Sequence, residues 1–244
     1  MGGLDSWTRG SHTAGDVTHP TYRKGVGPGV VVVHEVPGIT PDVLSFADEV
    51  VGRGFTVVLP HLFGDPGAPS STGRILTSIA RVCVSREFIK LKAGVASPVT
   101  GWLRSLARSL HDELGGPGVG ALGMCLTGGF ALAMMVDPAV VAPVVAQPSL
   151  PAALGRTRGG DLGLSPTDRE AVRRRVAEGC PVLGVRYRAD PATGTRFDTL
   201  TSMLGDGFLT VELEGRGHAT LTADRAQVAV DRVLDFFDER LKPR

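Results

Sequence analysis

GMCLTGG, at residues 123–129, is the stretch that decides the fold. Residues 119–122 before it are short and apolar, as a buried strand requires, and residues 130–136 after it are apolar enough for a buried helix. A reactive side chain at a strand-to-helix corner with small neighbours is the layout of a nucleophile elbow. The start of the helix supplies free N–H groups and the positive end of a dipole, which favour a thiolate and can hold an oxyanion. The stretch therefore predicts a cysteine nucleophile, Cys125.

A second interpretation of Cys125 is plain packing. Cysteine is among the most buried residue types, and one between a strand and a helix often only fills the core. The rest of the chain has to decide between the two.

Composition limits the class of protein. The chain has 244 residues, of which 42% are hydrophobic, and we expect a polar arm or edge strand over residues 1–29 and a single α/β domain over residues 30–244. Lys and Arg number 26 against 25 Asp and Glu, a formal net charge of +1, which favours neither nucleic acid nor a membrane surface as partner. Three widely spaced cysteines and no apolar leader over residues 1–29 favour a reducing, cytoplasmic location.

The pattern of apolar runs and turn residues alternates between strands and helices. Strands are predicted at residues 30–34, 55–60, 119–122, 140–145, 181–185 and 208–213. Helices are predicted at residues 41–54, in two or three stretches up to 114, and at 130–136, 166–178, 195–204 and 224–241. This alternation predicts a doubly wound, mostly parallel sheet with helices on both faces. The glycines at 115–118 precede a strand rather than a helix, so no dinucleotide cofactor is expected, and no Cys/His cluster predicts a metal.

Four polar residues come just after predicted strands: Glu35, Cys125, Asp190 and His218. Parallel strands end at one edge of a sheet, where ligands bind. The chain order nucleophile, acid, histidine is that of the α/β-hydrolase fold. The combination is a stronger indication of catalysis than any one residue.

The chemistry assigns each group a role. His218 would take the proton of the Cys125 thiol and later return it, while Asp190 would fix the tautomer of His218 and favour its cation. The backbone N–H groups of Val36 and Leu126 would form the oxyanion hole.

Other interpretations of these residues stay open at this point. His218 could be a surface residue, and Asp190, which precedes a proline, could be a turn former, with Asp198 or Asp206 as the acid. His34 begins no HExxH motif and is interpreted as a hydrogen-bonded histidine rather than a metal ligand. Ser149 follows a strand without an elbow and is interpreted as loop.

Residues 34–39, the elbow at 123–126, the Asp190 turn and Gly217-His218 together resemble the dienelactone hydrolase family, over about residues 28–240. The resemblance implies an α/β-hydrolase fold and a triad of Cys125, Asp190 and His218. It also implies that Glu35 is an extra carboxylate, which pairs near the thiol and helps to take its proton when substrate arrives. The implied activity is that of carboxymethylenebutenolidase, hydrolysis of a lactone or small activated ester through an acyl-thioester, without a cofactor.

The chain departs from the family pattern at two positions. Thr127 stands where the family has glycine, and Thr222 stands where its best-known members have an arginine that holds the substrate's carboxylate. Arg86 or Arg81 could supply part of that substrate contact, although solvated helix charges would look the same.

Two alternatives to the hydrolase remain: a ligand-binding protein without catalysis, and a thiol redox sensor that uses Cys125. The sequence leaves open whether the chain is a monomer or a homodimer, and whether residues 61–73 and 150–165 cap the pocket.

Overall fold

The structure is a computed structural model, and it describes residues 3–84, 98–149 and 159–242. Eight strands form one sheet in the order β1-β2-β4-β3-β5-β6-β7-β8. The strands are β1 (Thr8–Ala14), β2 (Val17–Lys24), β3 (Gly29–Val33), β4 (Thr56–Pro60), β5 (Val119–Met124), β6 (Val140–Ala146), β7 (Val182–Tyr187) and β8 (Phe208–Leu213). Only the β1/β2 and β2/β4 pairs are antiparallel, so the predicted mostly parallel sheet is confirmed.

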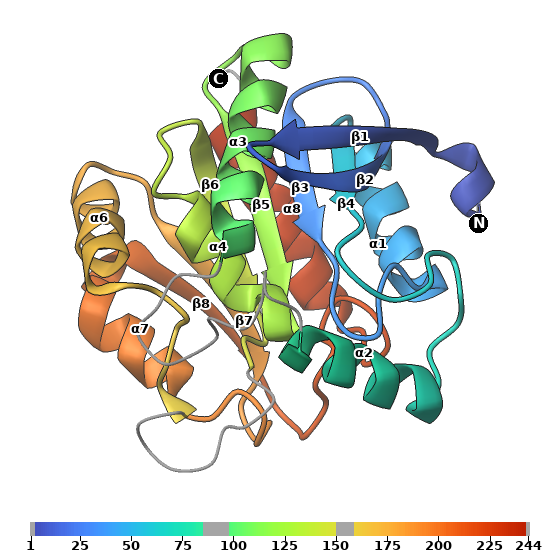
Figure 1. Ribbon diagram of the computed structural model, residues 1–244. Coiled ribbons are helices and arrows are strands. Elements are labelled where there is room, and N and C mark those ends of the chain that lie inside the picture. Colours follow the sequence, from blue (N-terminus) through green and yellow to red (C-terminus); the bar gives the residue numbers. More distant parts are fainter. Residues whose placement is uncertain (1–2, 85–97, 150–158, 243–244) are drawn as a thin grey trace.

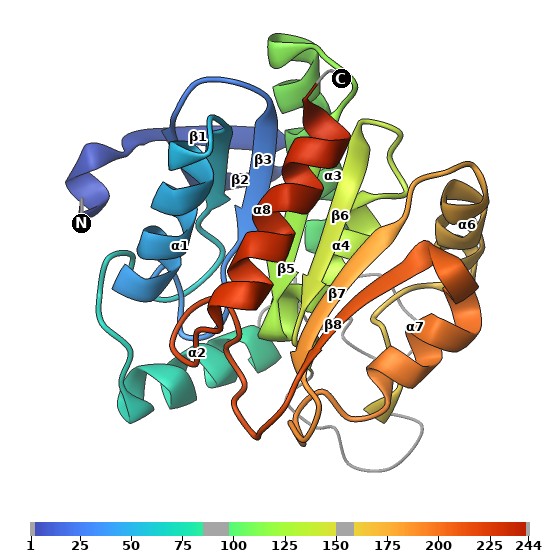
Figure 2. The same ribbon diagram turned by 180° about the vertical axis from the view of Figure 1, so that it is seen from behind.

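Helices cover both faces of the sheet. They are α1 (Pro41–Gly52), α2 (Thr72–Val84), α3 (Pro98–Leu114), α4 (Gly128–Met134), α6 (Pro166–Ala177), α7 (Arg196–Leu204) and α8 (Gln227–Leu241). In Figure 1 the face toward the viewer carries α3, α4, α6 and α7, and Figure 2 shows α1 and α8 on the opposite face. The short 3-10 helices are η1 (Leu4–Ser6), η2 (Cys125–Thr127) and η3 (Gly205–Gly207).

The central strands are buried on both sides, which explains their unbroken apolar sequences. In β3, Val31 and Val33 belong to the core under α3 and α4, whereas Val30 and Val32 belong to the core under α1 and α8. A parallel strand sandwiched in this way has no solvated face, so a polar side chain is accommodated only beyond its end. This is why the polar residues gather at one edge of the sheet.

The amino-terminal segment contains two strands, of which β1 is the expected edge strand and β2 is an additional one. β1 and β2 form a hairpin in which Gly15 adopts a φ of 59°, and β2 then pairs with β4. β1 is largely exposed on both faces, so its sequence carries none of the apolar signal that identified the inner strands. The hairpin is part of the same sheet.

No helix among residues 3–84, 98–149 and 159–242 has the length and apolar character needed to cross a membrane.

Small residues are required at the corner between β5 and α4. A Cβ on Gly123 would lie 2.2 Å from the carbonyl oxygen of Thr127, and one on Gly129 would lie 2.4 Å from that of Leu162. Both neighbours are backbone atoms, which cannot turn away as a flexible side chain can. The glycines therefore let the chain reverse at the corner.

We predict that Gly123→Ala destabilises the protein by about 1–3 kcal/mol, because the new methyl group overpacks the corner against backbone. Gly101→Ala is the matched control, since a Cβ at this position in α3 meets nothing within 4 Å and should stabilise the helix by about 0.5–1 kcal/mol. Urea unfolding measures both free energies, and equal stabilities of the two variants would refute this account of the corner.

Candidate active site

Cys125 lies at the turn from β5 into α4, as the first residue of η2. Its φ is +53°, in the left-handed region that residues with a side chain rarely adopt. Its carbonyl oxygen accepts hydrogen bonds from the N–H of Gly128 and from the N–H of Ser149, the latter at 2.9 Å. Strained backbone of this kind persists where the surroundings fix it, and it occurs often at functional sites. The thiol is thereby presented at the edge of the sheet, half-buried.

Thr127, the first departure from the family pattern, is fully buried in this corner. Its hydroxyl oxygen accepts the N–H of Met124 at 3.0 Å. The same oxygen is 2.9 Å from the carbonyl oxygen of Met124, 3.1 Å from that of Val33 and 3.2 Å from that of His34, and these three share its single proton. The hydroxyl therefore ties the elbow to the end of β3, and the corner has room for the extra atoms.

Asp190 and His218 form a hydrogen-bonded pair, with Nδ1 of His218 2.8 Å from Oδ2 of Asp190. Asp190 also accepts the hydroxyl of Thr193 at 2.7 Å and the N–H of Ala192 at 2.9 Å. Burial opposes the charge of Asp190, but the hydrogen bonds from His218 and Thr193 outweigh it and lower the pKa of the carboxyl group. The alternative acids lie elsewhere, Asp198 in α7 and Asp206 in η3.

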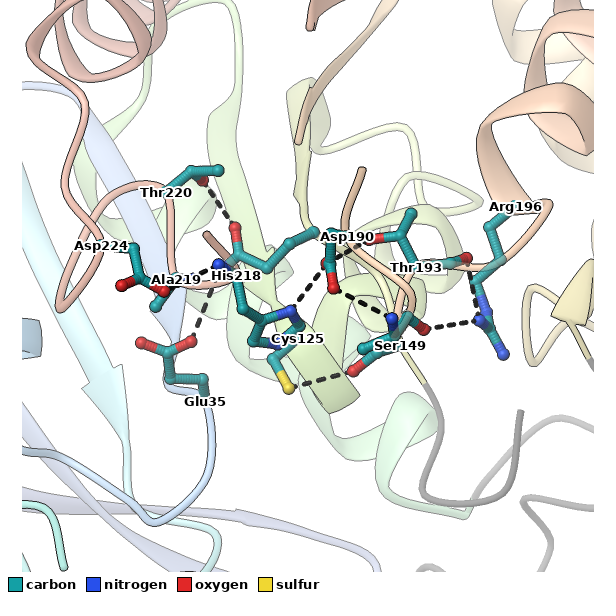
Figure 3. A network of polar contacts seen from close by, with 12 residues as sticks. Glu35, Cys125, Ser149, Asp190, Thr193, Arg196, His218, Ala219, Thr220 and Asp224 are labelled. Atoms are coloured by element: carbon teal, nitrogen blue, oxygen red, sulfur yellow. Dashed lines mark hydrogen bonds and ion pairs between the residues drawn. The ribbon is translucent and has the colours of Figure 1, made fainter. Parts of the chain in front are cut away.

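The ring of His218 bonds to Asp190, as Figure 3 shows, and it also interacts electrostatically with the thiol of Cys125. Burial alone would lower the pKa of His218, but hydrogen bonds to Asp190 and Cys125 outweigh burial and raise the pKa to about 10. The loop that carries the ring is held by Asp224, whose Oδ2 accepts the N–H groups of His218 at 2.7 Å and Ala219 at 3.2 Å. The structure thus brings the three residues of the predicted triad together.

Ser149 is a contact of the thiol that the sequence interpretation missed. Its hydroxyl oxygen is 3.0 Å from the sulfur of Cys125 (Figure 3). Ser149 follows β6 closely, so the rule that selected Glu35 and Asp190, a polar residue just past a strand, would have included it. The sequence alone indicates a loop residue there, because no elbow surrounds it.

Glu35 lies at the same edge but is held away from a direct bond to the thiol. Its Oε1 accepts the hydroxyl of Thr222, and its Oε2 accepts the side-chain amide of Gln147 at 3.2 Å. Burial raises the pKa of Glu35, against the hydrogen bond from Thr222 and the charge of His218. Among the described residues neither carboxylate oxygen bonds to Cys125, so the role of Glu35 toward the thiol stays a prediction.

Gln147 is the second residue that sequence reasoning missed here. It is fully buried with a φ of 34°, and its Oε1 accepts the hydroxyl of Thr220 at 2.6 Å. The side chain bridges Glu35 to the loop that carries His218. A glutamine at the end of a strand carries no motif, but its place after β6 is the same signal as for Ser149.

The substrate contact expected of Arg81 or Arg86 stays a prediction. Arg81 is exposed on α2, and Arg86 lies outside the described residues. A different arginine, Arg196 of α7, is 1% exposed and lines a small cavity with Leu126 and Ser149. Its Nε donates to the carbonyl oxygen of Asp161 at 2.8 Å. Burial lowers the pKa of Arg196, while the nearby charges of Asp161 and Cys125 oppose that effect. The sequence offered no signal for a buried arginine in a helix.

His34 is a buried, hydrogen-bonded histidine, as predicted. Nδ1 is 3.0 Å from the carbonyl oxygen of Glu35, and Nε2 accepts the N–H of Leu62 at 3.2 Å. Burial lowers the pKa of His34 to about 4, so the ring is neutral. Within the described part of the chain, no group of three or more His, Cys, Asp or Glu is arranged to hold a metal ion.

Comparison with known proteins places this geometry in context. A sequence model described as "Dienelactone hydrolase family" matches residues 16–158, more than half of the chain. A search of the curated proteins found no match. Among solved structures, the dienelactone hydrolase from Anabaena variabilis ATCC 29413 superposes with a TM-score of 0.68 at 16% identity, covering 97% of this chain and 98% of that one.

Two further solved structures are similar in fold. A putative dienelactone hydrolase from Klebsiella pneumoniae subsp. pneumoniae MGH 78578 gives a TM-score of 0.60 at 16% identity, covering 96% of this chain and 98% of its own. A cold-adapted esterase from an Arctic intertidal metagenomic library gives a TM-score of 0.63 at 14% identity, covering 96% of this chain and 93% of that one. At these identities the likeness concerns the fold alone.

We predict that Asp190→Asn lowers the pKa of His218 from about 10 toward the ordinary value of 6.5, because a neutral amide no longer favours the imidazolium. A raised pKa stabilises the fold fully below pH 6.5, and this stabilisation is lost as the pH rises through 10. The stability difference between wild type and variant should therefore shrink between pH 6.5 and 10.

NMR titration of the His218 ring measures the pKa directly, and unfolding at several pH values measures the linkage. Asp198→Asn is the control, since this exposed residue of α7 lies away from the pair. An ordinary pKa for His218 in the wild type would mean that the pair does not hold the proton.

Proposed function

The chain belongs to the dienelactone hydrolase family, and from that premise we propose that it hydrolyses a lactone or small activated carboxylic ester through an acyl-thioester on Cys125. Family membership supports a hydrolase, and the matched residues include Glu35 and Cys125. The observation that carries the finer proposal is the contact of His218 with the thiol of Cys125 on one side and the carboxylate of Asp190 on the other.

The ring of His218 is already protonated at neutral pH, because its pKa is raised to about 10, so in acylation the thiol proton of Cys125 passes to Glu35 and His218 serves as the acid. The thiolate attacks the carbonyl carbon of the substrate, and the carbonyl oxygen becomes an oxyanion that accepts the N–H groups of Val36 and Leu126. Each donor of this kind is typically worth about 3 kcal/mol in the transition state. Collapse of the intermediate breaks the bond from carbon to the ester oxygen, which takes the proton from His218. The acyl group is left on sulfur; with a lactone, the released hydroxyl stays attached to it.

Deacylation uses the same groups in reverse. His218 takes a proton from water as the water oxygen attacks the thioester carbon, and the oxyanion again uses Val36 and Leu126. The carbon–sulfur bond then breaks, the carboxylic acid leaves, the sulfur recovers its proton from Glu35, and His218 is again protonated. Ser149, 3.0 Å from the sulfur, is placed to donate a hydrogen bond to the thiolate in both halves of the cycle.

Glu35 fits the role of proton acceptor in the first step. In Figure 3 its carboxylate and Asp190 lie on either side of the His218 ring. Burial raises the pKa of Glu35, so an ionised Glu35 has a stronger affinity for a proton than an exposed carboxylate has. We propose that release from Thr222 on substrate binding lets Glu35 take the thiol proton, in line with the role that the family resemblance implies.

We predict that Cys125→Ala lowers hydrolysis of p-nitrophenyl acetate and of dihydrocoumarin, a simple lactone, by about 10³-fold or more, because no nucleophile is left. Cys180→Ala is the matched control, since Cys180 is a buried thiol whose sulfur faces the backbone of Val140 and Val141. Equal activity of wild type and Cys125→Ala would remove Cys125 from the mechanism.

The same assay separates the two alternatives. A ligand-binding protein would release at most one equivalent of nitrophenolate and then stop. A redox sensor would turn over no ester and would form a sulfenate on Cys125 under mild peroxide, which mass spectrometry detects. Steady turnover that depends on Cys125 excludes both.

We predict that Glu35→Gln slows acylation at least about 10-fold and deacylation less, because glutamine keeps the shape and can accept the Thr222 hydroxyl but cannot take a proton. Stopped-flow measurement of the nitrophenolate burst gives the acylation rate. Glu113→Gln, at an exposed residue paired with Arg23, is the control. An unchanged burst rate would leave Glu35 with a structural role only.

A further inference from the structure

His34 is a buried polar residue next to the site that the proposed mechanism does not use. It is 0% exposed, and it follows β3 directly. The ring of Phe63 packs edge-on against it, with centroids 4.5 Å apart and planes at 76°. His34 therefore lies in a dry environment, where a hydrogen bond is electrostatically stronger than in water.

The hydrogen bonds of His34 determine where its proton lies. The ring is neutral, so one nitrogen carries hydrogen and the other is an acceptor. Nε2 accepts the backbone N–H of Leu62, so it cannot be the protonated nitrogen. The proton is therefore on Nδ1, and Nδ1 donates to the carbonyl oxygen of Glu35 at 3.0 Å.

That carbonyl belongs to the peptide unit whose N–H is the N–H of Val36. A peptide unit is planar, and in the trans form its C=O and N–H point in opposite directions. A hydrogen bond that fixes the carbonyl of Glu35 toward His34 thus fixes the N–H of Val36 on the side away from His34, and it also polarises that N–H. Among the described residues, the N–H of Val36 donates to no acceptor.

We propose that His34 is a positioning residue for the oxyanion hole: its Nδ1–H holds the Glu35–Val36 peptide so that the N–H of Val36 stays aimed at the developing oxyanion. This inference rests on the proposed function, because it assumes that Val36 is one of the two donors. Leu62 completes the arrangement, since its N–H on Nε2 keeps the ring in the tautomer that donates to Glu35. The loop after β4 is in this way connected to the loop after β3.

Three variants separate positioning from packing. His34→Asn keeps a donor where Nδ1 lies and loses the acceptor for Leu62, because the asparagine amide branches from Cγ as the ring does. His34→Gln reaches the Nε2 position instead and loses the donor to Glu35. His34→Phe keeps the ring volume and loses both bonds. His12→Phe, in β1, is the control for a histidine hydrogen-bonded away from the site, to Ser105.

The first readout is the kinetics of phenyl acetate and of its thiono analogue, in which sulfur replaces the carbonyl oxygen and accepts hydrogen bonds poorly. His34→Phe and His34→Gln should lower kcat for the oxygen ester about 10- to 100-fold with little change in KM, since a misaimed donor forfeits part of its contribution. The ratio of kcat for the oxygen ester to kcat for the thiono ester should fall in the same variants. His34→Asn should recover most of the kcat for the oxygen ester and most of the ratio between the two esters. His12→Phe should match the wild type in both quantities.

The second readout does not need activity. The amide proton of Val36 should shift upfield in His34→Phe and in His34→Gln, and return in His34→Asn, as measured by NMR. An unchanged amide shift of Val36 would overturn the inference. So would values of kcat, and of the rate ratio between the oxygen ester and the thiono ester, that fall in proportion to the loss of thermal stability in each variant whether or not the variant keeps a donor at the Nδ1 position. If the wild type hydrolyses no ester, the proposed function fails on its own, and the Val36 shift still decides whether His34 holds this peptide.

Discussion

The left-handed backbone of Cys125 is the constraint on which the site depends. A φ of +53° is unfavourable for a residue with a side chain, so other segments have to hold it. The carbonyl of Cys125 is bonded to Gly128 and Ser149, and the hydroxyl of Thr127 ties the same corner to the end of β3. The thiol of Cys125 is therefore fixed by three strand ends at once, β3, β5 and β6. Relaxation of this corner would move the thiol away from His218.

The sequence predicts the architecture well where burial dictates the residues. Strands with apolar side chains on both faces fit only the interior of a sheet covered by helices, and the elbow glycines fit only a tight corner. The sequence predicts an arm or one edge strand where the structure has the hairpin of β1 and β2, because β1 is largely exposed and carries no such pattern. In the site, the residues directly past buried strands were found, including Asp190, because this fold collects polar groups there.

What could not be predicted is how these residues pair. Gln147, Ser149 and Asp224 have no motif, and their partners are far away in the chain: Gln147 bonds to Glu35, and Asp224 holds the loop of His218. The hydrogen-bond partner of Thr222 could not be predicted from the sequence either. As a departure from the family pattern, Thr222 puts the substrate contact in doubt, but the structure gives it a different function, a hydrogen bond to Glu35. Thr222 thus belongs to the network that orders the carboxylate.

The central claim is that acyl transfer passes through the sulfur of Cys125, and trapping the intermediate tests it most directly. The wild type is mixed with p-nitrophenyl acetate, quenched in acid within milliseconds, digested and analysed by mass spectrometry. The account predicts one acetyl group per chain, on Cys125, which is released by hydroxylamine as a thioester is and which disappears as turnover proceeds. An acetyl group on another residue, or turnover without any acylated protein, would contradict it.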